Sequence, residues 1–160
     1  MLEILSHQLH CVSQPDALDL SIDLISPRMA NPKVKQFMLA ELQLQDEQVF
    51  SSVTARIGSS GTCWTGDVVL VRSVDNVNFV AGQVWLLTSL AEHGPFALVS
   101  LWSLESADKP KGVAMWRMSQ APTLVALRLL LAPVIWTEYR PGCAKTIIPP
   151  QFRGLSAVAE

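Results

Sequence analysis

Three short apolar runs in the middle of the chain dominate its pattern of hydrophobic and polar residues. They cover residues 68–71, 82–87 and 96–102, are rich in Val, Leu and Trp, and are separated by turn-forming residues. Such runs are typical of consecutive buried strands. The pattern therefore predicts three strands, the second and third joined as a hairpin by a tight turn near His93.

The predicted hairpin is apolar on both faces. A turn centred near His93 places Trp85 opposite Leu101 and Val84 opposite Trp102. An antiparallel hairpin with one face in water alternates apolar and polar residues, and this one does not. We therefore expect the second face to be covered by barrel closure, by the N-terminal segment or by a partner chain.

The flanking segments show other periodicities. Apolar residues at every second position from 18 to 24 predict a half-buried strand. Asn31 and Pro32 predict the start of a short helix over about 32–40, because Asn caps helices and Pro suits the first helical position. Residues 105–112 are predicted to form a surface loop. Further strands are predicted in residues 41–57 (one or two), 113–118, 124–131 (running into a single helical turn), 134–136 and 146–148.

The predicted fold is mainly β, with α+β at the margin. It is a small antiparallel barrel or sandwich-like sheet with an N-terminal extension and one or two short helices. A chain of 160 residues is long enough to bury a real core. We expect residues 1–30 to dock on the main body as an extension, residues 31–154 to form a single β-rich domain, and residues 155–160 to form a C-terminal tail.

Charge is sparse and unevenly distributed. Only 16% of residues are charged, below the roughly 25% typical of soluble domains. The net charge of −2 argues against a strong overall attraction to nucleic acid. The C-terminal half is nevertheless basic, which leaves weak nucleic-acid contact open through Lys109, Lys111, Arg117, Arg128, Arg140 and Lys145.

Cysteine use and hydropathy indicate the setting. Cys11, Cys63 and Cys143 are too few and too dispersed for a disulfide framework. The N-terminus lacks the pattern of a signal peptide, and the longest apolar region, 124–136, is too short and interrupted to span a bilayer. The sequence therefore predicts a soluble protein of a reducing, intracellular compartment, without membrane contact and with no indication of its oligomeric state.

No motif for catalysis or for cofactor binding is complete. His7, His10 and Cys11 lack a second pair of metal ligands at suitable spacing, so no metal site is predicted. A nucleophilic pair of Cys143 or Cys63 with His93 stays open, because sequence does not show whether such residues meet in space. We predict no catalytic residues and no cofactor.

The tryptophans are the remaining candidates for chemistry. Two interpretations fit them: core packing, since each brings a large apolar area, or an aromatic recess that receives a cation such as methyl-lysine, or an apolar peptide side chain. All five fall at strand or strand-entry positions: Trp64, Trp85, Trp102, Trp116 and Trp136.

The predicted register favours Trp102 as the outward tryptophan of the hairpin. Its face also carries the polar Thr88 and Ser100, whereas Trp85 shares its face with apolar residues. We therefore predict that Trp85 lies in the core and that a binding recess includes Trp102, Val84, Ser100, Thr88 and Trp64.

The order of these segments resembles that of bromo-adjacent homology (BAH) modules and related small β-barrels of chromatin-associated proteins. Gly66-Asp67 precedes an apolar strand, residues 80–85 lead to an aromatic position, the next strand carries Trp102, and an apolar strand-and-turn follows over 125–136. The resemblance implies a protein-binding or chromatin-binding module without catalysis.

The leading functional hypothesis is a non-catalytic module that binds a protein or peptide through a strand edge or an aromatic recess. Two alternatives remain: an enzyme-like domain with a hidden Cys/His site, and a weak nucleic-acid-binding domain that uses the basic C-terminal half.

Overall fold

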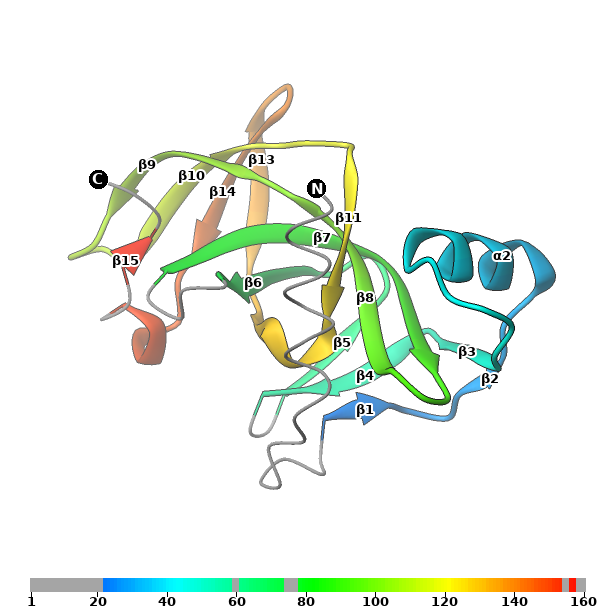
Figure 1. Ribbon diagram of the computed structural model, residues 1–160. Helices are drawn as coiled ribbons and strands as arrows, with labels where there is room; N and C mark the ends of the chain where they lie inside the picture. The colour runs from blue at the N-terminus through cyan, green and yellow to red at the C-terminus, as the bar shows by residue number, and fades with distance from the viewer. Residues whose placement is uncertain (1–21, 59–60, 74–77, 154–155, 158–160) are drawn as a thin grey trace.

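The computed structural model describes residues 22–58, 61–73, 78–153 and 156–157 (Figure 1). In this part of the chain the fold is mainly β, with three sheets and one α-helix, which confirms the predicted class. None of the sheets is closed as a barrel, so of the two predicted architectures the barrel is not the one adopted. Residues 1–21, where most of the predicted N-terminal strand falls, lie outside the described residues.

The main sheet is built around β7 (Asn78–Leu90), the longest strand of the described chain. One edge of β7 pairs with β8 (Gly94–Leu101), and β8 in turn pairs with β11 (Pro122–Ala126). The other edge of β7 pairs in succession with two shorter strands, each of which carries one further strand. These are β6 (Val68–Arg72) with β12 (Leu130–Pro133), and β3 (Val49–Ser52) with β2 (Arg28–Met29).

The register of the β7–β8 hairpin differs from the predicted one. Leu90 pairs with Gly94, so the turn centres one residue before His93, and Val84 lies opposite Val99 rather than opposite Trp102. A β-bulge at Trp85 shifts the register once more. A bulge adds one residue to one strand and exchanges the faces that its later residues occupy. The predicted pairings of Val84 and Trp85 are therefore wrong.

Three other layers cover the two faces of the hairpin. The third sheet contributes Ala55 and Cys63 to a cluster with Val84 and Val99 on one face. It comprises β1 (Asp23–Leu24), β4 (Thr54–Ile57) and β5 (Gly61–Trp64).

The opposite face is covered by the only α-helix among the described residues and by the second sheet. Helix α2 (Pro32–Glu41) packs Met38 against the hairpin near its tip. The second sheet lies at the far end of the hairpin (Figure 1). It consists, in spatial order, of β13 (Trp136–Arg140), β14 (Cys143–Ile147), β10 (Val113–Arg117) and β9 (Ser103–Asp108).

Helix α2 begins as the sequence predicts. The side chain of Asn31 accepts a hydrogen bond from the backbone N–H of Val34 at 2.9 Å, and Pro32 occupies the first turn. The helix ends at Glu41, and Gln43 then adopts a positive φ of 52°. The prediction of a short helix over about 32–40 is confirmed.

Two predictions about the C-terminal half are wrong in part. Residues 105–108 form β9 rather than a loop, and the predicted strand at 134–136 begins only at Trp136 and continues to Arg140. Both strands lie at edges of the second sheet, where backbone hydrogen bonds form without apolar side chains. The strand running into a helical turn at 124–131 is confirmed as β11, a single 3-10 turn over Leu127–Leu129, and β12.

The two ends of the described chain are paired with the body. Strand β1 pairs with β4, and β2 with β3. Strand β15 (Ser156–Ala157) runs parallel to the start of β7. The proposed docking of residues 1–30 as one segment, and the division into a domain of 31–154 and a tail of 155–160, stay predictions.

Candidate functional site

The structure does not assemble the predicted recess. Trp102, Val84, Ser100 and Thr88 are all buried, and Trp64 alone among the five predicted binding residues is exposed, at 55%. Thr88 lies under helix α2, where its hydroxyl contacts the sulfur of Met38 at 3.5 Å. These residues therefore present no common surface to a partner, and their role in binding stays a prediction.

The two tryptophans of the hairpin have exchanged the places that the sequence predicts. Trp102 is 3% exposed, whereas Trp85 is 45% exposed. Trp102 lies where the chain passes from β8 to β9, and its ring packs edge-on against Trp136 at 5.6 Å. The bulge turns Trp85 outward, and its indole N–H donates to the Ser100 hydroxyl at 3.0 Å. The prediction of an outward Trp102 is wrong because the second sheet covers the face of the hairpin on which this residue lies.

The second sheet, by contrast, has one buried and one exposed face. In strands β10 and β14, Ala114, Trp116, Ala144 and Thr146 are fully buried on the inner face; on the outer side Cys143 is also buried, whereas Arg117, Lys145 and Ile147 are exposed. Their neighbours in sequence point the other way. We call this outer surface the open face; its residues on β10 and β14 are Val113, Met115, Arg117, Cys143, Lys145 and Ile147.

One end of the open face is apolar. Val113 pairs with Ile147, and the backbone N–H of Ile147 donates to the carbonyl of Ile135 at 3.0 Å. Ile135 is 73% exposed and Ile147 46% exposed. Large aliphatic side chains so exposed, side by side on one sheet, are typical of a surface that a partner covers.

The other end of the open face carries a polar cluster centred on Glu105. A bulge in β9 places this carboxylate within 3.3 Å of the guanidinium groups of Arg117 and Arg140. The hydroxyl of Tyr139 donates to Glu105 at 3.0 Å, and the Cys143 thiol lies 3.8 Å away. The bond from Tyr139, followed by the two arginines, lowers the pKa of Glu105. The cluster links all four strands of the sheet.

Lys145 occupies the middle of the open face, between Met115 and Thr137. Its side chain is exposed, and within the described part of the chain it forms no ion pair. The two arginines share Glu105, and Asp108, which lies opposite Val113 on β9, pairs with Lys111 in its own turn. Lys145 is therefore a cation without an ion-pair partner in the described chain, and it lies beside the apolar end of the open face.

The six basic residues predicted for nucleic-acid contact are divided. Arg117, Arg140 and Lys145 lie on the open face, and Lys109 and Lys111 lie in or beside the turn that joins β9 to β10. Arg128 lies in the 3-10 turn between β11 and β12, outside the second sheet.

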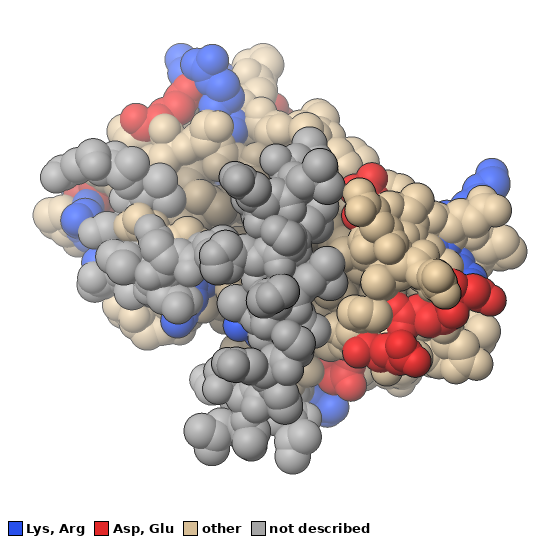
Figure 2. Space-filling model, in the orientation of Figure 1, with Lys and Arg blue, Asp and Glu red and all other residues tan. Residues whose placement is uncertain are grey.

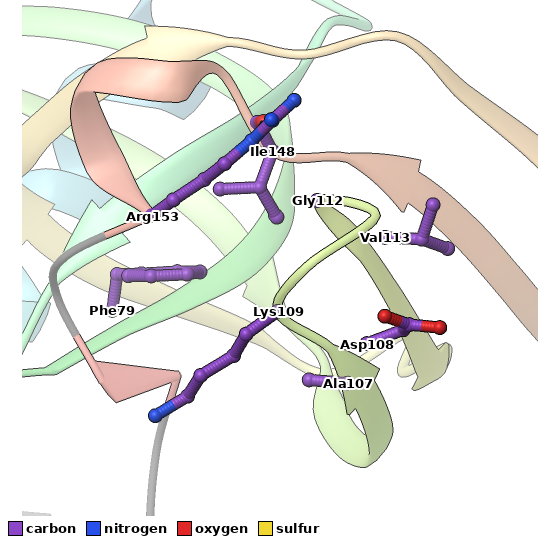
Figure 3. A pocket seen from close by; sticks show the side chains of 8 residues that line it. All are labelled: Phe79, Ala107, Asp108, Lys109, Gly112, Val113, Ile148 and Arg153. Atoms are coloured by element: carbon purple, nitrogen blue, oxygen red, sulfur yellow. The ribbon is translucent and has the colours of Figure 1, made fainter.

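A shallow pocket of about 270 Å³, part of it open to solvent, lies at the apolar end of the second sheet (Figure 3). Its apolar walls are Phe79, Ala107, Val113 and Ile148, with Gly112 between them. Its charged residues are Asp108, Lys109 and Arg153.

The opposite end of the molecule is acidic. Red side chains gather beneath α2 in Figure 2, and the acidic residues of the loop after the helix and of the hairpin tip are Glu41, Asp46, Glu47 and Glu92. Glu47 accepts from the backbone N–H of Glu92 at 3.1 Å and lies 2.7 Å from the His93 ring. These contacts tie the loop to the hairpin tip.

The possible Cys/His pairs gain no support from this arrangement. His93 pairs with Glu47 at the hairpin tip, while Cys143 faces Glu105 on the second sheet. Cys63 belongs to the cluster beneath the third sheet; burial, and then the charge of Asp67, raise the pKa of its thiol to about 12. A thiol with so high a pKa is a poor nucleophile at neutral pH. His7, His10 and Cys11 lie outside the described residues.

Comparisons with known proteins identify no relative: no family model, no curated protein and no solved structure matches the chain. None of the helices in the described residues is long and apolar enough to cross a membrane.

Proposed function

We propose that this chain is a non-catalytic interaction module that binds an acidic, partly apolar segment of another protein on the open face of the second sheet. The proposal is carried by one observation. Two exposed isoleucines lie side by side with a lysine that forms no ion pair in the described chain, all on the outer surface of one sheet. Ile135 and Ile147 offer apolar area, and Lys145 offers a positive charge directly beside them.

The charge of the surface selects the partner's chemistry. The unpaired charge of Lys145 favours a partner of opposite sign, because complementary charges steer association and disfavour wrong partners. The exposed apolar side chains require that the same partner also carry apolar residues. An acidic segment with interspersed Leu, Ile, Val or Phe meets both conditions.

Nucleic acid fits the same surface less well. Arg117 and Arg140 are already engaged by Glu105, which leaves Lys145 as the cation of this face ready to meet a phosphate. Backbone binding relies on several such contacts, and the chain as a whole is negative. A chromatin-associated partner, which the resemblance to BAH modules implies, stays a finer prediction.

The test is affinity selection of random dodecapeptides displayed on phage against the immobilised full chain. We expect enrichment of sequences that combine Asp or Glu with aliphatic residues. An enriched peptide, labelled with a fluorophore, is then titrated by anisotropy. We expect its affinity to fall about tenfold or more for Ile147→Asp and for Lys145→Glu, since each removes a central contact of the interface.

Two matched variants serve as controls. Met29→Asp alters another exposed apolar residue, on β2, and Lys33→Glu alters another exposed lysine, on α2. Both should leave the affinity unchanged. A selection without enrichment, or an enriched peptide whose affinity is insensitive to the two open-face variants, would contradict the proposal.

A further inference from the structure

The pocket of Figure 3 adjoins the open face. Val113 pairs with Ile147 in the apolar row of that face and is also one of the residues that line the pocket. The other walls come from the start of β7, the turn between β9 and β10, and the segment after β14, and they include Phe79 and Ile148 on the inner side of the sheet (Figure 3). The pocket therefore lies at the edge of the sheet, where a side chain of a partner on the apolar row reaches it around Val113.

The exposed side chain of Arg153 is oriented at this pocket by one hydrogen bond. Its Nε donates to the carbonyl of Ile148 at 3.0 Å. The guanidinium lies flat over the backbone of Gly112, where an added Cβ would come within 2.3 Å of Nε. Gly112 also has a positive φ of 64°, so this position suits glycine for two reasons. The arginine is thus oriented before any ligand arrives, which reduces the entropy lost on binding.

The positive charges at the pocket have no counterpart in the described part of the chain. Neither Arg153 nor Lys109 forms an ion pair there. Asp108, the acidic residue of the wall, is directed to its own turn: its carboxylate accepts from the backbone N–H of Lys111 at 3.1 Å and lies 3.9 Å from the Lys111 ammonium.

The size and lining of the pocket limit what it holds. The space of about 270 Å³ includes open solvent, so its enclosed part is well below the 300–1,000 Å³ of most small-molecule sites. The pocket therefore suits the end of a single side chain better than a whole small molecule. Phe79 and Ile148 offer an apolar wall for methylene groups, and a planar guanidinium matches a carboxylate through two parallel hydrogen bonds.

We infer that this pocket anchors one acidic side chain of the segment bound on the open face, with its carboxylate on Arg153 and with Lys109 as a second cation at the other end of the pocket. The inference rests on the proposed function and gives it a specific contact. It predicts that the affinity of the bound segment depends on a carboxylate placed to reach past Val113.

The first test uses a small probe. The amide spectrum of the ¹⁵N-labelled full chain is recorded while N-acetyl-glutamate amide, and separately N-acetyl-glutamine amide, is added in the millimolar range. We expect saturable shifts of the Gly112 and Ile148 amides and of the Arg153 Nε–H with the glutamate probe, and none with the glutamine probe. The double variant Lys109→Gln, Arg153→Gln should abolish the shifts of the two amides, and Lys145→Glu should leave all three in place.

Two results would overturn the carboxylate assignment. One is equal shifts with both probes, which would show that the acidic group contributes nothing. The other is a stronger response to inorganic phosphate than to the glutamate probe at equal concentration, which would make this a general anion site.

The second test separates this inference from the proposed function. The affinity of the selected peptide is measured for Arg153→Gln and for Lys145→Glu. A loss of about tenfold in both supports both statements, as expected for removal of charge-assisted hydrogen bonds. A loss for Lys145→Glu alone overturns the anchor and leaves the open face standing. A loss for Arg153→Gln alone overturns the open-face proposal, and no loss in either overturns both.

Discussion

The main sheet and the second sheet differ in how many of their faces are covered by other layers. In the main sheet both faces of the β7–β8 hairpin are largely apolar and both are covered, by the third sheet on one side and by α2 and the second sheet on the other. In the second sheet the described residues cover only the inner face. Its outer face keeps Ile135 and Ile147 exposed although no core requires them there. Packing against other layers thus explains the apolar residues of the main sheet, but it does not explain the exposed isoleucines of the second sheet.

The largest expected effect separates the two faces of the second sheet. Trp116 is fully buried on the inner face, so Trp116→Ala should lower the free energy of unfolding by about 3–5 kcal/mol. Ile147→Ser, on the open face, should change it by less than about 0.5 kcal/mol. Urea titration of both variants measures the difference. Comparable losses would show that the open-face side chain contributes to stability as much as the inner-face one, which would contradict the proposed difference between the two faces.

A smaller effect distinguishes two buried tryptophans at the junction of the sheets. The indole N–H of Trp116 donates to the Thr146 hydroxyl at 2.8 Å, whereas that of Trp102 is buried without a hydrogen-bond partner in the described chain. Trp116→Phe leaves Thr146 without its donor, which should cost about 1–3 kcal/mol more than Trp102→Phe. The same urea titration measures this difference, and a larger loss for Trp102→Phe would contradict the assignment.

The smallest effect concerns the polar end of the open face and its dependence on pH. The pKa of Glu105 is lower in the folded chain than in the unfolded chain, first because of Tyr139 and then because of the two arginines. Its contribution to stability is therefore complete above about pH 4.3, the ordinary value for Glu, and is lost as the pH falls through the folded pKa. Glu105→Gln should flatten the fall of thermal stability below about pH 4.3.

Tyr139→Phe is the companion variant, because it removes the first cause of the lowered pKa and keeps the carboxylate. Its fall of thermal stability at acidic pH should be intermediate between that of the wild type and that of Glu105→Gln. If all three proteins lose stability with the same slope, the cluster does not hold the folded-state charge of Glu105.

Much of the architecture follows from local sequence signals. The cap at Asn31, the turn residues after β7 and the apolar runs of β6, β7 and β8 are sufficient to predict the helix and the central strands. Strand β9 is not predictable in this way, because Ser103–Asp108 carries few apolar residues and is held by backbone pairing to β10. The bulge that turns Trp85 outward has no sequence mark either, and the burial of Trp102 depends on the second sheet, whose packing on the hairpin no local pattern shows.

The candidate site left one signal in the sequence. The residues of β14, from Cys143 to Ile147, alternate between small or buried groups and Lys145 with its outward neighbours. Periodicity shows that such a strand has two different faces, but it does not show which tertiary layer leaves one of them bare. Glu105 and Arg117 lie on consecutive strands, but Arg140 is 35 residues from Glu105 on β13, and only the fold brings it to the cluster.

The most direct measurement is a map of backbone amide shifts in the ¹⁵N-labelled full chain when a selected acidic peptide is added. The account predicts that the largest shifts fall on Val113, Met115, Lys145 and Ile147, and that amides of α2 and β8 remain in place. Shifts concentrated on α2, or around Trp85 on the main sheet, would contradict the claim that the open face of the second sheet is where this protein meets its partner.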